Sequence, residues 1–121
     1  MMNPLQTLRM CARVADQKKG EEIVALDVRG ISSITDYFLI VSAQSEPHLK
    51  ALRNEIELKL KEKGVQPHGI DGFPHSQWIV MDYLDVVVHI FAKDRREFYA
   101  LERLWGDAKR VKWDGEREEQ G

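Results

Sequence analysis

Cysteine is almost absent from this chain of 121 residues, because Cys11 is the only one. A single cysteine excludes an intramolecular disulfide and any metal site built from several thiolates, and it favours a reducing compartment. Long apolar runs are also missing. No stretch has the length of a membrane span, and the first twenty residues lack the apolar core of a signal peptide. We therefore expect a soluble, cytoplasmic protein that does not bind membranes.

An excess of charge of one sign is missing as well. The chain has 18 basic and 20 acidic side chains, which gives a net charge of −2. Broad binding to phosphate backbones requires a basic surface, so any direct contact with RNA should be minor. Lys93, Arg95 and Arg96 do form a basic cluster, which a solvent-exposed helix start explains more simply than RNA binding does. Binding to a basic protein stays open.

The motifs of common enzymes are missing too. Neither G-x-G-x-x-G nor G-x-x-x-x-G-K occurs, which disfavours nucleotide binding through a phosphate loop. His48, His68 and His75 do not have the spacing of metal ligands. No serine or cysteine lies in a recognisable nucleophile motif. We therefore predict no catalytic residue, no cofactor and no metal centre.

The hydrophobic pattern that is present predicts one α/β domain, a mixed sheet of about five strands with packed helices. The run from Tyr37 to Val41 is unbroken and apolar, so this strand should lie at the centre of the sheet with both faces covered. The domain should span residues 1–111, and the charged residues 112–121 should form a disordered tail. We predict helices at residues 4–19 and 46–63 and between Asp94 and Gly106, and strands at residues 23–28, 37–41, 65–71, 78–81 and 86–91.

An apolar hairpin is predicted between residues 78 and 91. Its strands are separated by Asp82-Tyr83-Leu84-Asp85, which indicates a tight turn. Tyr83 should be exposed at the tip of this turn. Tyrosine and tryptophan commonly anchor protein interfaces, so Tyr83 is the best contact residue that the pattern offers. In the second strand His89 shares a face with Val87 and Phe91, and a hydrogen-bonded structural role fits it better than catalysis does.

The two aspartates of this turn, Asp82 and Asp85, have three interpretations. Two close carboxylates can hold a divalent cation, since hard cations prefer oxygen ligands. Aspartate in a turn also accepts hydrogen bonds from the turn backbone, which is the more common arrangement. Alternatively, the pair presents negative charge to a basic partner. A pair of carboxylates within one turn is weak evidence for a metal, so the second and third interpretations are favoured.

Long motifs occur before the second predicted helix and in the last third of the chain. Thr35-Asp36-Tyr37-Phe38 is followed by Ser42 and Ser45, and Trp78 by the runs D-Y-L-D-V-V-V-H and F-Y-A-L-E-R-L-W-G-D-A. Together these motifs closely resemble the ribosomal silencing factor family, also called Iojap-like, over roughly residues 5–111. Two positions depart from the family pattern. Leu84 stands where relatives often have glycine, and Ser42-Ala43-Gln44-Ser45 lacks a glycine that relatives often carry.

The resemblance implies a small α/β domain related in fold to nucleotidyltransferases but without their catalytic motif. It also implies binding to the large ribosomal subunit at its fourteenth protein, on the face that meets the small subunit. Such a factor blocks subunit joining and represses translation, especially when nutrients are scarce. Organellar members of the family act in assembly of the large subunit.

The hairpin and the resemblance together predict a partner-binding surface. Aspartates would complement a basic ribosomal protein, and aromatic side chains would supply most of the affinity. Two alternatives stay open: a metal-dependent nucleotidyltransferase-like enzyme that uses the aspartate pair, and a ribosome assembly factor without a silencing role. Exposed aromatics fit a homodimer equally well. The predicted contact residues are Trp78, Asp82, Tyr83, Asp85 and His89.

Overall fold

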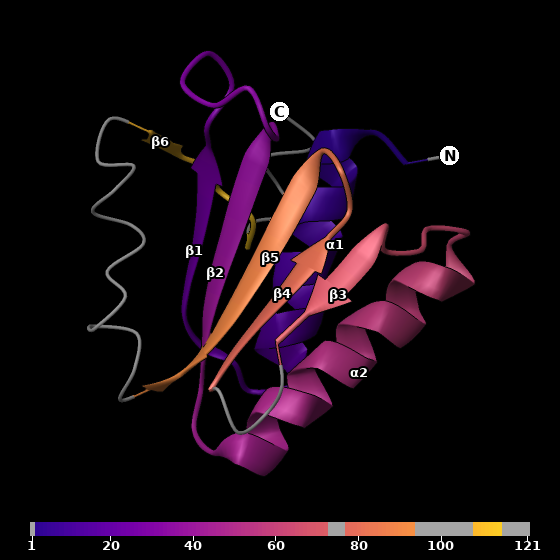
Figure 1. The fold of residues 1–121 in the computed structure, drawn as a ribbon, viewed down its shortest axis with the longest axis vertical. Helices are drawn as coiled ribbons and strands as arrows, with labels where there is room; N and C mark the ends of the chain where they lie inside the picture. The colour runs from indigo at the N-terminus through magenta and orange to yellow at the C-terminus, as the bar shows by residue number, and fades with distance from the viewer. Residues whose placement is uncertain (1, 73–76, 94–107, 115–121) are drawn as a thin grey trace.

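Two helices and six strands make up the described part of the chain, which is residues 2–72, 77–93 and 108–114 of a computed structural model. The predicted helix between Asp94 and Gly106 lies outside these residues. The elements are α1 (Pro4–Gln17), β1 (Glu21–Asp27), β2 (Tyr37–Ala43), α2 (Glu46–Glu62), β3 (Gly69–Asp71), β4 (Trp78–Asp82), β5 (Val86–Ala92) and β6 (Lys109–Arg110). The strands form one mixed sheet in the order β3-β4-β5-β2-β1-β6 (Figure 1). The predicted fold class is confirmed, with one strand more than expected.

The centre of the sheet is the parallel pair β2–β5. Every residue of both strands is buried, and the register runs from Tyr37 opposite Val86 to Ala43 opposite Ala92. On its other side β2 pairs with β1, and β5 pairs with β4, both in antiparallel fashion. Strands that are buried on both faces have continuous apolar sequences, which is why the run at residues 37–41 predicted the central position correctly.

Both helices pack against the same face of the sheet. α2 is capped at its N-terminus by Ser45, whose Oγ accepts a hydrogen bond from the His48 N–H at 3.2 Å. Its apolar stripe is fully buried, together with Cys11 of α1, and this burial raises the pKa of the Cys11 thiol. The helical spacing of the stripe turns every one of its side chains toward the sheet. The stripe consists of Leu49, Leu52, Ile56 and Leu60.

The edge strand β6 was not predicted from the sequence. Lys109 and Arg110 are charged and exposed, so they carry no hydrophobic alternation. Backbone pairing with Asp27 and Leu26 of β1 is what makes them a strand. A strand that is defined by its neighbour rather than by its own side chains leaves no pattern in the sequence.

The first residues of the predicted tail belong to the fold. The Arg9 Nε–H of α1 donates a hydrogen bond to the Lys112 carbonyl at 3.0 Å. Trp113 is partly buried and packs against the core between the sheet and the helices. Lys112 and Trp113 therefore contact α1 and the core, and residues 115–121 lie outside the described part of the chain.

The hairpin turn between β4 and β5 comes later than expected. The Tyr83 N–H donates a hydrogen bond to the Val86 carbonyl at 2.8 Å, so the strand pairing continues past Asp82. The Asp85 N–H donates to the Tyr83 carbonyl at 2.9 Å, which closes a three-residue γ-turn around Leu84. Leu84 has a φ of 72° and is 55% exposed. This left-handed backbone explains why glycine suits the position.

Replacing Leu84 by glycine should stabilise the domain by about 0.5–1 kcal/mol, because a positive φ costs an L-residue about 1–2 kcal/mol. Part of that gain is offset by the greater freedom of glycine in the unfolded chain. Urea denaturation followed by tryptophan fluorescence measures the change. Leu84→Ala is the matched control, because alanine keeps the left-handed backbone. Equal stability of the two variants would contradict the strain at this residue.

Candidate recognition surface

The face of the sheet that points away from the helices carries three of the predicted contact residues. Residues paired across antiparallel strands share a face, so the pairs Trp78–Phe91 and Val80–His89 lie together on it. Trp78 and Val80 are partly exposed, whereas His89 and Phe91 are buried. We define the recognition face as the set Phe38, Asp71, Trp78, Val80, Asp82, Val87, His89 and Phe91.

An aromatic cluster forms the centre of the recognition face. The Trp78 ring stacks on Phe91 with centroids 5.2 Å apart and an interplanar angle of 24°. The Phe38 ring meets His89 edge-on, also at 5.2 Å. The Trp78 Nε1–H donates a hydrogen bond to His89 Nδ1 at 3.2 Å. These contacts fix the orientation of the indole, so Trp78 presents a rigid apolar surface with little side-chain entropy left to lose on binding.

His89 is a neutral imidazole in this cluster. Because Nδ1 accepts the hydrogen bond from Trp78, the ring proton belongs on Nε2. Nε2 is buried and has no hydrogen-bond partner within the described residues. Burial lowers the pKa of His89 to about 4, so the ring stays uncharged at neutral pH. The hydrogen-bonded structural role that the sequence favoured is confirmed, with Trp78 as the group that His89 positions.

The two turn aspartates have different surroundings. Asp82 Oδ1 accepts a hydrogen bond from the Leu84 N–H at 2.8 Å, which confirms the turn interpretation for this residue. The Asp85 carbonyl accepts hydrogen bonds from the Asp36 and Tyr37 N–H groups, so the turn is tied to the start of β2, and the Asp85 side chain is exposed. Over residues 2–72, 77–93 and 108–114, no group of three or more His, Cys, Asp or Glu side chains is arranged to hold a metal ion.

The predicted exposure of Tyr83 is wrong. Its side chain is 7% exposed and belongs to the core on the helix side of the sheet. The cause is the one-residue extension of the strand pairing: Tyr83 follows Asp82 in strict alternation, so it points to the opposite face. Burial raises the pKa of the phenol, and its hydroxyl has no hydrogen-bond partner among the described residues. Tyr83 packs under the turn on the helix side of the sheet and is not part of the recognition face.

Asp71 and Val80 belong to the recognition face and were missed from the sequence. Asp71 of β3 pairs with Val80 of β4, so its exposed carboxylate lies on the same face as the aromatic cluster. Alternation within β4 alone would have placed Val80 beside Trp78. No local signal sets the register of a three-residue edge strand, so Asp71 could not have been found in this way.

The arrangement is a partly exposed aromatic and apolar centre with the carboxylates of Asp71 and Asp82 at its β3–β4 side. Neither α1 nor α2, the helices found in the described ranges, is long and apolar enough to cross a membrane. An apolar, aromatic centre with charged groups at its rim is common in protein interfaces.

Comparison with known proteins identifies the family. Residues 2–121 match the family described as "Ribosomal silencing factor during starvation". The chain belongs to the ribosomal silencing factor family. It is 44% identical to the ribosomal silencing factor of Bacillus subtilis over 107 residues, which cover 88% of this chain and 91% of that protein. A crystal structure of a protein from Chromobacterium violaceum superposes with a TM-score of 0.83 and 29% identity over 94% of both chains.

Organellar proteins are similar as well. The chain is 35% identical to chloroplastic Iojap of Arabidopsis thaliana over 83% of its own length and 42% of that protein. It is 29% identical to mouse "Mitochondrial assembly of ribosomal large subunit protein 1" over 79% of its length and 43% of that protein. These likenesses confirm the Iojap-like resemblance that the motifs indicated.

The neutral state of His89 predicts that acid destabilises the domain. A histidine in the unfolded chain titrates near pH 6.5, whereas the pKa of folded His89 is about 4. Between these values only the unfolded state binds the proton, so stability falls as the pH decreases from about 6.5 to about 4, by up to about 3 kcal/mol. Above this range His89 is neutral in both states and its contribution no longer varies with pH.

The matched variant is His89→Phe, which keeps an aromatic ring and cannot titrate. Denaturant unfolding of both proteins across this pH range should show the parent losing stability relative to the variant as the pH falls. The carboxylates titrate in both proteins, so their contributions to the pH dependence of stability cancel in the comparison. A stability difference that does not vary with pH would contradict the buried, neutral imidazole.

Proposed function

We propose that this ribosomal silencing factor binds the large ribosomal subunit at its fourteenth protein, on the face that meets the small subunit. From there it blocks association of the subunits and represses translation. The observation that carries the proposal is the recognition face, where a partly exposed aromatic centre lies beside two carboxylates. The chain also belongs to a family that is described as a ribosomal silencing factor, which supports the same proposal.

The chemistry of the recognition face suits a basic protein partner. Proteins that contact RNA carry basic surfaces, and Asp71 and Asp82 supply the opposite charge. Charges at the rim of an interface mainly raise the association rate. Trp78 and Val80 would be desolvated at the centre, where aromatic side chains usually contribute most of the affinity and slow dissociation.

The other predicted contact residues have supporting roles. His89 holds the Trp78 indole through its Nδ1 and is itself buried, so its contribution is to orientation. The exposed carboxylate of Asp85, at the end of the γ-turn, adds negative charge close to Asp82. Tyr83 keeps that turn in place from the helix side and does not touch the partner.

The proposed mechanism is steric. A 14.0 kDa domain that is bound at the joining face needs no chemistry to prevent association, because it occupies volume that the small subunit requires. Regulation then depends on the fraction of large subunits that carry the factor, which follows from its concentration and its affinity. A steric block needs a binding surface and no reactive cleft, and the described residues offer such a surface.

A second function, assembly of the large subunit, is favoured by one observation. The mouse relative is named for the assembly of the mitochondrial large subunit. Both functions need the same binding surface, so they differ in the particle that is bound. Affinity for mature free large subunits supports silencing, and a strong preference for immature precursors supports assembly.

Removing the acidic charges of the recognition face should weaken binding to large subunits. The variant Asp71→Lys with Asp82→Asn should lower the affinity roughly tenfold or more, because two attractive charges are lost and one repulsive charge is added. Asparagine at position 82 keeps an oxygen that can accept the hydrogen bond from the Leu84 N–H, so the turn should remain. Co-sedimentation with purified large subunits measures the effect at several salt concentrations.

The matched control is Asp16→Lys with Glu62→Gln, which changes the net charge equally at exposed positions of α1 and α2. This control should sediment as the parent does. If both variants lose binding to the same extent, overall charge rather than the recognition face determines affinity. If neither loses binding, the partner surface lies elsewhere.

The steric mechanism also predicts the outcome of a subunit-joining assay. Excess protein, added to separated large and small subunits before they are mixed, should lower the fraction of joined ribosomes seen in a sucrose gradient. The Asp71→Lys, Asp82→Asn variant should inhibit only at a concentration higher by the same factor as its loss of affinity. Normal joining in the presence of large subunits saturated with the factor would refute the blocking role.

A further inference from the structure

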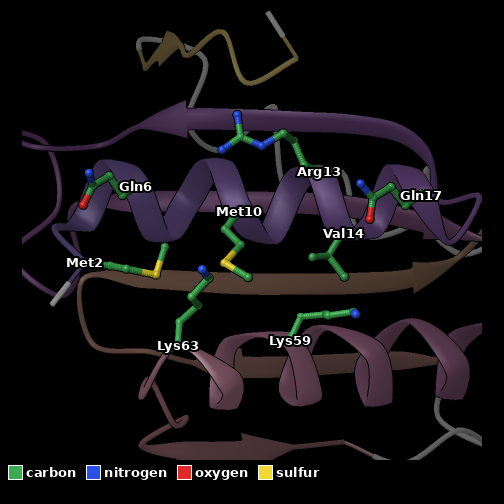
Figure 2. Close-up of a pocket in the computed structure, with 8 residues that line it drawn as sticks. All are labelled: Met2, Gln6, Met10, Arg13, Val14, Gln17, Lys59 and Lys63. Carbon is green, nitrogen blue, oxygen red and sulfur yellow. The ribbon is translucent and has the colours of Figure 1, made fainter. Parts of the chain in front are cut away.

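A groove runs between the two helices on the side of the molecule opposite the recognition face. Its volume is about 510 Å³. Figure 2 shows Met2, Met10 and Val14 on the side of α1 that faces α2. Lys63, the C-cap of α2, extends toward them, and Lys59 lies along α2 at the edge of the groove. Met2 and Met10 are partly exposed, so apolar surface remains open to solvent in the groove.

The groove is positively charged, although the chain is slightly acidic overall. Among the described residues that line it are three cations, Arg13, Lys59 and Lys63, and no carboxylate. Lys59 and Lys63 form no ion pair with any residue of the described ranges. The first twenty residues carry four basic and one acidic side chain, whereas the remainder carries 14 basic and 19 acidic ones. The cations that line the groove would attract an acidic ligand.

The shape and lining of the groove favour a helix as its occupant. The groove follows α1 from Gln6 to Gln17, which is roughly 17 Å at the usual rise per residue of a helix. Sites for nucleotides or single-stranded RNA usually offer an aromatic ring on which a base stacks, and none of the lining residues that the structure describes is aromatic. Methionine side chains adapt to irregular apolar partners, and amphipathic helices commonly dock into grooves of this kind.

We infer that the groove between α1 and α2 binds an acidic amphipathic helix of another protein. The apolar ridge of that helix contacts Met2, Met10 and Val14, and its carboxylates meet Lys59 and Lys63. The binding of this helix does not depend on the proposed function; only the recruitment of its protein to the large subunit rests on it. Because the groove and the recognition face lie on opposite sides of the sheet, the helix and the large subunit can be bound at the same time. The factor would then recruit an acidic protein to the subunit that it occupies.

The test uses the full chain and a synthetic helical peptide of about 18 residues, long enough to form an isolated helix, with a leucine ridge flanked by glutamates. The chain has four methionines, so ¹³C-methyl methionine spectra report on the groove directly. The signals of Met2 and Met10 should shift on titration. The signal of Met81, which is fully buried in β4, should not shift and serves as the internal reference.

Charge exchange makes the test specific. Lys59→Glu with Lys63→Glu should weaken peptide binding roughly tenfold, and a peptide with lysine in place of glutamate should restore it. The matched control is Lys50→Glu with Lys61→Glu, which makes the same charge change at exposed positions of α2 outside the groove and should bind as the parent does. Asp71→Lys with Asp82→Asn should also leave peptide binding unchanged, which separates this inference from the proposed function.

Four results would overturn the inference. The first is equal binding of the glutamate and lysine peptides by the parent protein. The second is stronger displacement by tripolyphosphate or a short oligouridine than by unlabelled peptide, which would assign the groove to phosphate or RNA. The third is a shift of the Met10 signal with protein concentration alone, which would assign it to a second copy of the chain. The fourth is the absence of any shift at Met2 and Met10.

Discussion

The parallel pairing of β2 with β5 is the constraint on which the rest of the structure depends. Two parallel neighbours cannot be joined by a tight turn, so the chain between them must leave the sheet and return. Here that chain contains α2 and the antiparallel strands β3 and β4. The carbonyl of Asp85, which accepts hydrogen bonds from Asp36 and Tyr37, sets where the pairing starts. The position of the hairpin turn relative to β2 follows from this one carbonyl.

This topology gives the two faces of the sheet different properties. One face is covered by α1 and α2 and contains the larger of the two apolar clusters that the described residues form, including the fully buried stripe of α2. The other face keeps a smaller aromatic cluster, in which Trp78 and Val80 remain partly exposed. The helix layer therefore supplies most of the apolar burial. The strand layer can then keep part of its aromatic surface open to solvent.

Local sequence patterns predicted the elements better than the surface that they form. Helical spacing located the stripe of α2, and the unbroken apolar run identified β2 as central. The position of Tyr83 depended on one extra residue of strand pairing, and a shift of one residue moves a side chain to the opposite face. Asp71 joined the recognition face through the register of β3, and β6 exists through its pairing with β1. Register and edge pairing are tertiary properties, so no local pattern records them. Trp78, Asp82 and His89 lie on one face of the sheet, because alternation within a single hairpin is enough to group them.

The burial of Cys11 makes it possible to measure how often α1 separates from the sheet. Its thiol is completely buried on α1 and is the only one in the chain. A thiol reagent can reach it only when α1 separates from the sheet, because burial both blocks access and disfavours the reactive thiolate. The rate at which the native protein is labelled therefore reports how often this helix opens. The opening rate of α1 can therefore be measured on the native sequence, without an engineered cysteine.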